Sequence, residues 1–423
     1  MSLSTKVLLA LGVGIAAGLA LSVTHSPATH AVVAVVEPVG TLFIAAIRMT
    51  VIPLVVSSLI VGIAAAESGA DLARLGSRGI VLFVLLLLAS GVVAALVAPP
   101  VLAHVSLDPS AIASLRSAHG TPQLANGSAA LQTPGQWLAS LVPANAMRAA
   151  VDGAMLPLIV FALLFGLGLL AVPAERRGTI VAILRGVAAA MLVIVEWLLI
   201  VAPLGVFALV LPLVARLGLS AVGALATYVV LVSVAAFAFM LAVIYPAAIW
   251  GGRVSLKRFA RAALPAQAVA FSSRSSIAAL PALIESARTR LGLSDDVATF
   301  FLPLASALFR AGASLGLVTG CLFIARLYGI AIGPTQLATL VVTSVLTSFS
   351  IPGIPGGSIF AMVPVLTSVG LPIEGIGILL GVDTIPDIFR TTTNVTGQLA
   401  TAAIVGRDRR REIDIDADVD ANS

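Results

Sequence analysis

Residues 381–398, "GVDTIPDIFRTTTNVTGQ", contain the densest set of side chains that could bind a small molecule. Asp383 and Gln398 lie near the two ends of this stretch. Between them, four polar residues recur at the spacings i, i+3, i+4 and i+7, so that one face of a helix would carry Asp387, Arg390, Thr391 and Asn394. This face offers a carboxylate for an ammonium group, a planar guanidinium for a carboxylate, and amide and hydroxyl partners between them. It therefore suits a zwitterion with a second acid group.

The composition places this stretch inside a membrane. The chain has 423 residues, of which 59% are hydrophobic and only 10% are charged, and its mean hydropathy is +1.12. Its apolar runs continue for about 20 residues without the alternation of outer-membrane strands, so we predict an all-α polytopic membrane protein. Charged groups near the bilayer centre cost about 2.5–3.5 kcal/mol each, and a cluster of them therefore favours a functional role. The alternative is a buried ion pair that holds helices together.

Six apolar spans are predicted in the first part of the chain. They lie near 5–24, 34–66, 79–104, 150–172, 187–215 and 221–250. The loops after the second, fourth and sixth spans are basic, which places them in the cytoplasm together with the amino terminus and the charged tail 406–423. The nearly uncharged loop 105–145 is expected outside. We therefore predict a multi-pass protein of the cell inner membrane with both termini in the cytoplasm.

Two later segments differ from simple spans. Each has apolar flanks around a polar or Gly- and Pro-rich centre, and they cover 264–286 and 340–372. A non-helical centre survives at membrane depth only where protein or a water-filled cavity satisfies its backbone, so each segment is predicted to be a re-entrant helical hairpin with a polar tip. The two tips, 272–276 and 350–354, are 78 residues apart in the sequence. Interrupted segments at corresponding positions of two repeats indicate the substrate site of a transporter.

These features resemble the dicarboxylate/amino acid:cation symporters, a family that includes the archaeal aspartate transporters and the mammalian excitatory amino acid transporters. The resemblance covers nearly the whole chain and rests on "RMTVIPLVVSSLIVGI", "AMLPLIVFALLFGLGL", "APLGVFAL", "FSSRSSIAALP", "VLTSVGLP" and "DIFRTTTNVTG". It implies a glutamate-transporter-like fold with eight transmembrane helices, two re-entrant hairpins and inverted repeats. It also implies a homotrimer that works by elevator-type alternating access, with the second hairpin as the extracellular gate.

The resemblance divides the chain into three parts. Residues 1–250 would form transmembrane helices 1–6, of which helices 1, 2, 4 and 5 build the scaffold and helices 3 and 6 join the transport domain. Residues 251–405 would form the core of the transport domain, from the first hairpin to helix 8. Residues 406–423 would form a cytoplasmic tail.

The resemblance also assigns the site. Asp387 would bind the amino group of the substrate, Arg390 its side-chain carboxylate, and Asn394 with Thr391 the main-chain carboxylate and amine region. Each hairpin tip would add contacts, the first through Arg274, Ser275 and Ser276, and the second through the backbone of Gly353, Ile354, Pro355 and Gly356. An aspartate at position 387 favours an amino acid over a dicarboxylate.

The residues that bind sodium in the family are altered here. Its Asn-Met-Asp-Gly-Thr motif aligns with Phe309, Arg310, Ala311, Gly312 and Ala313. A second sodium-binding aspartate aligns with Gln398, and a Thr-Ser pair aligns with Ala89 and Ser90. Sodium is a hard cation that needs several oxygen ligands. We therefore predict that sodium coupling is absent.

Arg310 lies in "ALFRAGAS", a run that otherwise reads as a membrane helix. We expect it to act as a tethered cation, near the place where bound sodium would otherwise balance Asp383, Asp387 and the substrate. The alternative is an arginine that snorkels or forms a structural ion pair. Concentrative uptake would then need a proton, carried by Asp383, Asp387 or Glu196, and otherwise the protein would be an exchanger or facilitator.

Several alternatives stay open. L-aspartate or L-glutamate is the expected substrate, although Ala313 replaces a threonine that helps to hold the side-chain carboxylate. A proton-coupled C4-dicarboxylate transporter is the second choice, and sodium coupling through rebuilt sites is a third. An anion channel or a binding sensor could use the same pocket. No enzyme activity, cofactor, metal site or nucleic-acid partner is predicted.

Overall fold

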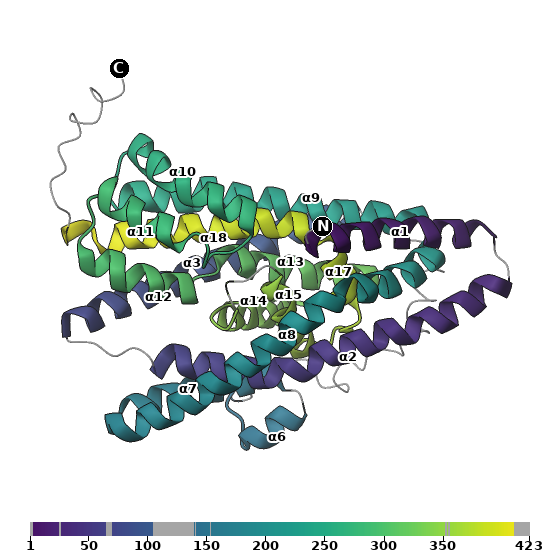
Figure 1. The fold of residues 1–423 in the computed structure, drawn as a ribbon, viewed down its shortest axis with the longest axis horizontal. Helices are drawn as coiled ribbons and strands as arrows, with labels where there is room; N and C mark the ends of the chain where they lie inside the picture. The colour runs from purple at the N-terminus through teal and green to yellow at the C-terminus, as the bar shows by residue number, and fades with distance from the viewer. Residues whose placement is uncertain are drawn as a thin grey trace.

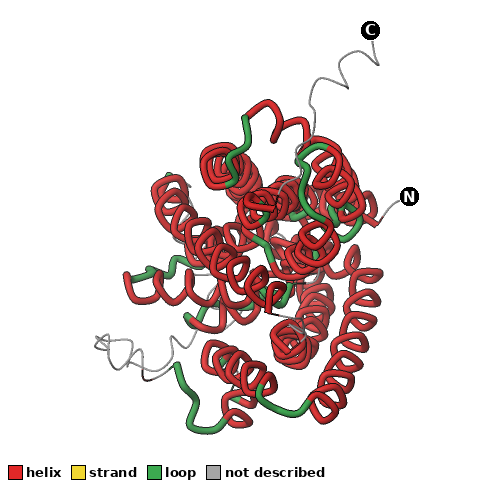
Figure 2. Tube along the Cα trace, turned by 90° about the vertical axis from the view of Figure 1, so that its left-hand side faces the viewer, coloured by secondary structure: helices red, strands yellow, loops and turns green. Residues whose placement is uncertain are grey.

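The computed structural model describes residues 3–24, 27–64, 70–104, 139, 141–152, 154–351, 353 and 356–409. In these ranges the regular structure is helical throughout and contains no strand (Figure 2). The all-α class predicted from the sequence is therefore confirmed for the described part of the chain.

The first part of the chain forms long apolar helices (Figure 1). They are α1 (Leu3–Thr24), α2 (Pro27–Ala64), α3 (Ala70–Ala103), the short α6 (Ala146–Val151), α7 (Met155–Leu170), α8 (Ala174–Leu217) and α9 (Leu219–Phe239). Two wider π-helical turns, Met240–Ile244 and Ala247–Gly251, continue α9. Each predicted span overlaps one of these helices. Helix α8 begins at Ala174 instead of near residue 187, because a helix can continue past the membrane through charged residues that hydropathy reads as a loop.

The second part of the chain forms shorter, interrupted helices. They are α10 (Leu256–Ser273), α11 (Leu280–Thr289), the π-helical turn Val297–Phe301, α12 (Leu302–Leu308), α13 (Ala311–Leu327), α14 (Pro334–Ser348), α15 (Gly357–Phe360), α16 (Met362–Ser368), α17 (Gly375–Val382), α18 (Thr384–Val405) and the turn Arg407–Arg409. We call α10 with α11 the first hairpin, and α14 with α15 and α16 the second hairpin. Gly292 and Gly370, which are 78 residues apart like the two tips, have φ of 67° and 71° just after each hairpin. The two hairpins therefore also end alike.

The helices that follow the hairpins are interrupted at two places by non-helical residues. Phe309 and Arg310 separate α12 from α13, and Asp383 separates α17 from α18. The run 307–314, which reads as one membrane helix in the sequence, is thus not continuous. Each break leaves backbone groups that other parts of the protein must satisfy.

Six helical segments of the described chain are long and apolar enough to cross a membrane. They are Thr5–Val23, Ala31–Ala64, Leu75–Ala103, Ala174–Arg216, Leu219–Gly251 and Val297–Leu327. Two shorter apolar segments are Met155–Leu170 and Gly357–Ser368. The chain is therefore a multi-pass membrane protein, as the composition predicts.

The helices pack in two groups. In the first group, α1 and α2 pack along the long α8, and α7 packs against α2. In the second group, α3, α9 and α10 pack against α13, α14 and α18 (Figure 1). The groups meet where α17 lies along α8. Helix α17 approaches closely because a Cβ at Gly377 would overlap the side chain of Leu209.

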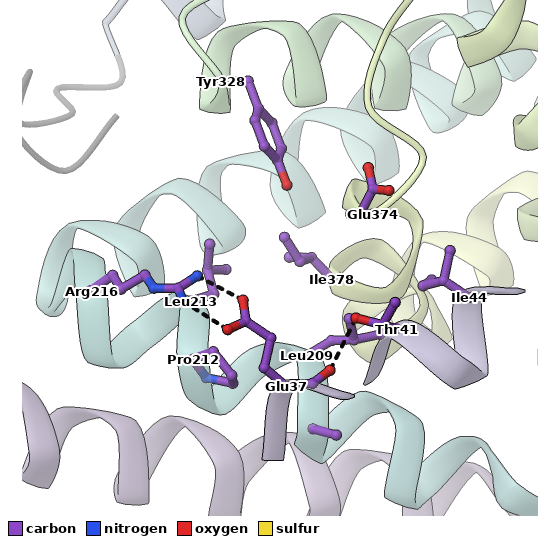
Figure 3. A pocket seen from close by; sticks show the side chains of 11 residues that line it. Glu37, Thr41, Ile44, Leu209, Pro212, Leu213, Arg216, Tyr328, Glu374 and Ile378 are labelled. Carbon is purple, nitrogen blue, oxygen red and sulfur yellow. Dashed lines mark hydrogen bonds and ion pairs between the residues drawn. The ribbon is translucent and has the colours of Figure 1, made fainter. Parts of the chain in front are cut away.

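An ion pair joins two helices of the first group near its contact with the second group. Arg216 of α8 donates to both carboxylate oxygens of Glu37 of α2, at 3.0 and 2.9 Å (Figure 3). This pair lines a cavity of about 40 Å³, and Tyr328 and Glu374 of the second group face it from the other side. Because the guanidinium satisfies Glu37 in a two-point contact, we assign this cluster a structural role in joining α2 to α8.

Candidate functional site

One small cavity in the second group is lined by six of the eleven substrate-binding residues predicted from the sequence, and by Arg310. It is lined by Ser276, Arg310, Ala313, Ile351, Gly353, Ser358, Asp387, Arg390, Thr391 and Asn394. These residues come from both hairpin tips, the start of α13 and one face of α18, so the helical stripe does converge with the two tips. The cavity has a volume of about 20 Å³, which is room for about one water molecule. The structure therefore holds the site closed.

Arg390 is the centre of the charged network. Its side chain is only 1% exposed, and its Nη2 donates to Asp383 Oδ1 at 2.6 Å and to Asp387 Oδ1 at 3.2 Å. Its Nε and Nη1 have no hydrogen-bond partner among the described residues, and neither has Asp383 Oδ2. Buried polar groups are nearly always satisfied. The unused donors of Arg390 are therefore available to a water molecule or a polar ligand.

Two glycines of α13 make room for Arg390. A Cβ at Gly316 would lie 2.5 Å from Arg390 Cδ and 2.9 Å from Nη1, and a Cβ at Gly312 would overlap the main chain of Arg390. Only glycine lets α13 approach α18 this closely without moving the guanidinium. The sequence analysis did not identify Gly316, because its role depends on a side chain in a distant part of the chain.

Asp387 connects both hairpin tips to this network. Its Oδ2 accepts a hydrogen bond from the main-chain N–H of Gly356 at 3.3 Å and lies 3.8 Å from Nη1 of Arg274. The tips also contact each other, since Ser275 Oγ donates to the carbonyl oxygen of Gly353 at 2.8 Å. Ser275 and Gly353 are separated by the same 78 residues that relate the two tips. The two repeats therefore meet at corresponding positions beside Asp387.

Arg310 is buried without an acidic partner. It is 2% exposed, its Nη1 donates to the carbonyl oxygen of Phe309 at 3.2 Å, and its Nε has no partner among the described residues. No ion pair joins it to an acid in the described part of the chain, whereas Asp383 and Asp387 pair with Arg390 and Arg274. The five charged groups are three arginines and two aspartates, a formal sum of +1. Arg310 therefore carries the charge that the protein leaves uncompensated.

Hydrogen-bond donors of the protein satisfy the carbonyl oxygens at the interruption between α12 and α13. The carbonyl of Phe309 also accepts from Gln398 Nε2 at 3.3 Å, and the carbonyl of Ala311 accepts from Ser90 Oγ. The side-chain oxygen of Asn394 accepts from the N–H of Gly312 at 2.8 Å. Ser90 and Gln398 therefore act as hydrogen-bond donors at the break. Gln398 stands where the sequence predicts the loss of a sodium-binding aspartate, and Ser90 belongs to the altered Thr-Ser pair.

The remaining predicted residues fall into two classes. Ile354 and Pro355 of the second tip lie outside the described residues, and so do most of loop 105–145 and the tail from 410 onwards. Glu196 is exposed on α8 and does not line the cavity.

Ser358 was not predicted, yet its buried hydroxyl lines the cavity and has no partner among the described residues. Its place directly after the two glycines of the second tip was the signal that could have identified it.

We expect Gly316→Ala to weaken the binding of L-aspartate, the ligand predicted from the sequence, because the new methyl group displaces the Arg390 guanidinium. Isothermal titration calorimetry on the purified protein should show an increase in Kd of about tenfold, the equivalent of about 1.4 kcal/mol. Gly320→Ala is the matched control one turn along α13, since its Cβ would meet the flexible end of Met362 instead. Equal affinities for both variants would contradict the role given to Gly316.

Nearly the whole chain matches known transporters. Residues 3–408 match the sodium:dicarboxylate symporter family. A proton/glutamate-aspartate symporter of Escherichia coli (strain K12) is 33% identical over 407 residues, which cover 96% of this chain and 92% of the relative. A proton/sodium-glutamate symport protein of Bacillus subtilis (strain 168) is 32% identical over 374 residues, covering 88% of this chain and 85% of the relative.

A more distant relative has a name that specifies a different class of substrate. A C4-dicarboxylate transport protein of Azorhizobium caulinodans is 26% identical over 382 residues, which cover 88% of this chain and 82% of the relative. These matches confirm the resemblance found in the sequence and the prediction of a transporter instead of an enzyme. The chain belongs to the sodium:dicarboxylate symporter family.

Proposed function

We propose that this protein is a secondary transporter of acidic amino acids, with L-aspartate and L-glutamate as its substrates. The observation that carries the proposal is the closed cavity between the two hairpin tips, in which Arg390 keeps unused donors beside the carboxylate of Asp387. A guanidinium and a carboxylate on one helix face complement the acid and the ammonium of one ligand. The names of the relatives, which include glutamate and aspartate symporters, support this choice.

The pose of the substrate follows from the donors and acceptors. Asp387 receives the ammonium group, Arg390 binds the side-chain carboxylate, and Asn394 with Thr391 holds the main-chain carboxylate and amine region. When the ammonium group arrives, Asp387 exchanges its contact with the Gly356 N–H for the substrate. Substrate binding is thereby linked to the position of the second tip, which serves as a gate.

Charge balance supports transport without sodium. The charged groups of the site sum to +1, and an acidic amino acid has a net charge of −1, so the loaded site is neutral. Without Arg310 the same groups would sum to zero, and the loaded site would need a bound cation to balance it. Because Gln398 and Ser90 already donate to the carbonyls at the break, protein groups take the place of sodium.

We also propose that the protein has the transmembrane architecture that the family implies. Eight transmembrane helices with two re-entrant hairpins would give a scaffold of α1, α2, α7 and α8 and a transport domain of the remaining helices. The two packing groups of the helices support this division. Elevator-type movement of the second group along α8, a homotrimer in the inner membrane, and both termini in the cytoplasm complete the proposal. Basic residues near the starts of α3 (Arg74, Arg78) and α8 (Arg176, Arg177) support this orientation.

A tethered charge cannot drive accumulation. Moving one charge through 100 mV is worth about 2.3 kcal/mol, but Arg310 returns with the empty carrier and therefore contributes none of this energy over a full cycle. Net uptake against a gradient must then use a proton, for which Asp383 and Asp387 are the candidates in the site. Without a proton the protein exchanges or equilibrates its substrates.

The test of this function is uptake of labelled L-aspartate and L-glutamate by the purified protein in liposomes. Uptake should be the same with sodium and with choline, and an imposed inward proton gradient should increase accumulation if a proton is coupled. Exchange against internal aspartate should proceed without either gradient. Strict dependence on sodium would contradict the sodium-independent mechanism, and absence of flux would contradict transport.

Replacing Arg310 tests whether this residue supplies the positive charge that balances the bound substrate. In sodium-free buffer, Arg310→Met should weaken L-aspartate binding about tenfold or more, because the loaded site then has an uncompensated negative charge. Arg310→Lys keeps the charge and should retain most of the affinity. Removal of an unpaired buried charge should leave the melting temperature unchanged or raise it. Unchanged affinity in a folded Arg310→Met protein would reduce Arg310 to a structural residue.

Replacing Asp387 tests the class of substrate. Asp387→Asn should raise the Kd for L-aspartate about 10- to 100-fold by removing the partner of the ammonium group. Binding of succinate, which has no ammonium group, should be unchanged or stronger in the same variant. If the Kd values of both ligands rise equally, Asp387 does not bind the amino group, and C4-dicarboxylate transport becomes the better assignment.

A further inference from the structure

A groove lies on the other side of Arg310 from the closed cavity. It has a volume of about 480 Å³ and runs between the hairpin tips and the helices α2 and α8. Arg310, Ile351 and Gly353 line both the groove and the cavity, so these three residues form the partition between them. Arg310 lies directly against the second tip, since a Cβ at Gly353 would be 2.8 Å from its Nη2.

The charge of this groove suits an anion. Two arginines line it, Arg310 from the break before α13 and Arg185 from α8, and no aspartate or glutamate lies among the lining residues. Neither arginine forms an ion pair with an acid in the described part of the chain. Ser58 of α2 adds a hydroxyl beside them. Two guanidinium groups in a partly enclosed site favour a carboxylate over a neutral ligand.

The groove also has the size that the cavity lacks. The closed cavity of about 20 Å³ holds about one water molecule, whereas the groove admits an acid of four or five carbons. Its wall is formed by the last part of α2, from Leu54 to Gly62, and the first part of α8, from Arg185 to Leu192. Basic residues lie close to both ends in the sequence, at the start of α3 (Arg74, Arg78) and of α8 (Arg176, Arg177), and the proposed orientation places them in the cytoplasm.

We propose that this groove is a second, transient binding site for the substrate on its cytoplasmic side. Arg185 and Arg310 bind the carboxylate there before the substrate enters the cavity and after it leaves. Arg310 touches both spaces, so it transfers the carboxylate between Arg185 and Arg390 when the tips part. This inference rests on the proposed transport of acidic amino acids, and it adds a specific role for Arg185, which lies outside the cavity.

The test compares the two sides of the membrane. In inside-out and right-side-out vesicles that contain the full-length protein, the concentration of L-aspartate that half-saturates exchange is measured for each face. Arg185→Gln should raise this concentration at the cytoplasmic face about fivefold and leave the outer face unchanged. Arg185→Lys should recover part of the loss. Arg176→Gln is the matched control, because it removes a charge from the same end of α8 but does not line the groove.

Each result decides the proposal. A selective loss at the cytoplasmic face in Arg185→Gln, absent in Arg176→Gln, supports it. No change, or an equal change at both faces or in both variants, overturns it. A change in chloride conductance without a change in half-saturation also overturns it, in favour of a path for inorganic anions. Exchange by the unmodified protein in the same vesicles reports separately on the proposed function.

Discussion

An arginine that is buried without an acidic partner among the described residues is the constraint around which this site is built. Burying an ion costs several kcal/mol even after relaxation, and among the described residues Arg310 recovers part of this cost through its hydrogen bond to the carbonyl of Phe309. The interruption between α12 and α13 leaves that carbonyl free of the helix, so the interruption and the burial of the charge depend on each other. The rest of the cost remains until an anion arrives. In the proposed mechanism this makes the empty site receptive to an acid without a bound metal cation.

The surrounding fold positions this charge by close backbone contacts. Gly312 and Gly316 allow α13 to lie against Arg390, and the contact of Ser275 with Gly353 closes the tips over the cavity. Asp387 is shared between α18, the second tip and Arg274, so in the proposed pose an ammonium group at Asp387 acts on both hairpins. The long helices α2 and α8, joined by Glu37 and Arg216, provide a separate body against which these elements rest.

Patterns inside one helix were predictable, and contacts between distant segments were not. The period of the α-helix alone identifies the stripe from Asp387 to Asn394, and a fixed offset relates the two tips. The break at Arg310 has no local signal, because no glycine or proline precedes it in "ALF" and the donors that stabilise it, such as Gln398, are far away in the sequence. Gly316 and Ser358 were missed for the same reason. Helix α8 is longer than predicted because hydropathy detects only its apolar part.

The most direct measurement of the central claim is a titration of L-aspartate into the unmodified protein at several sodium concentrations, with choline added to keep the ionic strength constant. If Arg310 supplies the charge that sodium would otherwise bring, Kd is the same at every sodium concentration. A Kd that falls steadily as sodium rises would contradict the account, because it would show that the loaded site still takes up a metal cation.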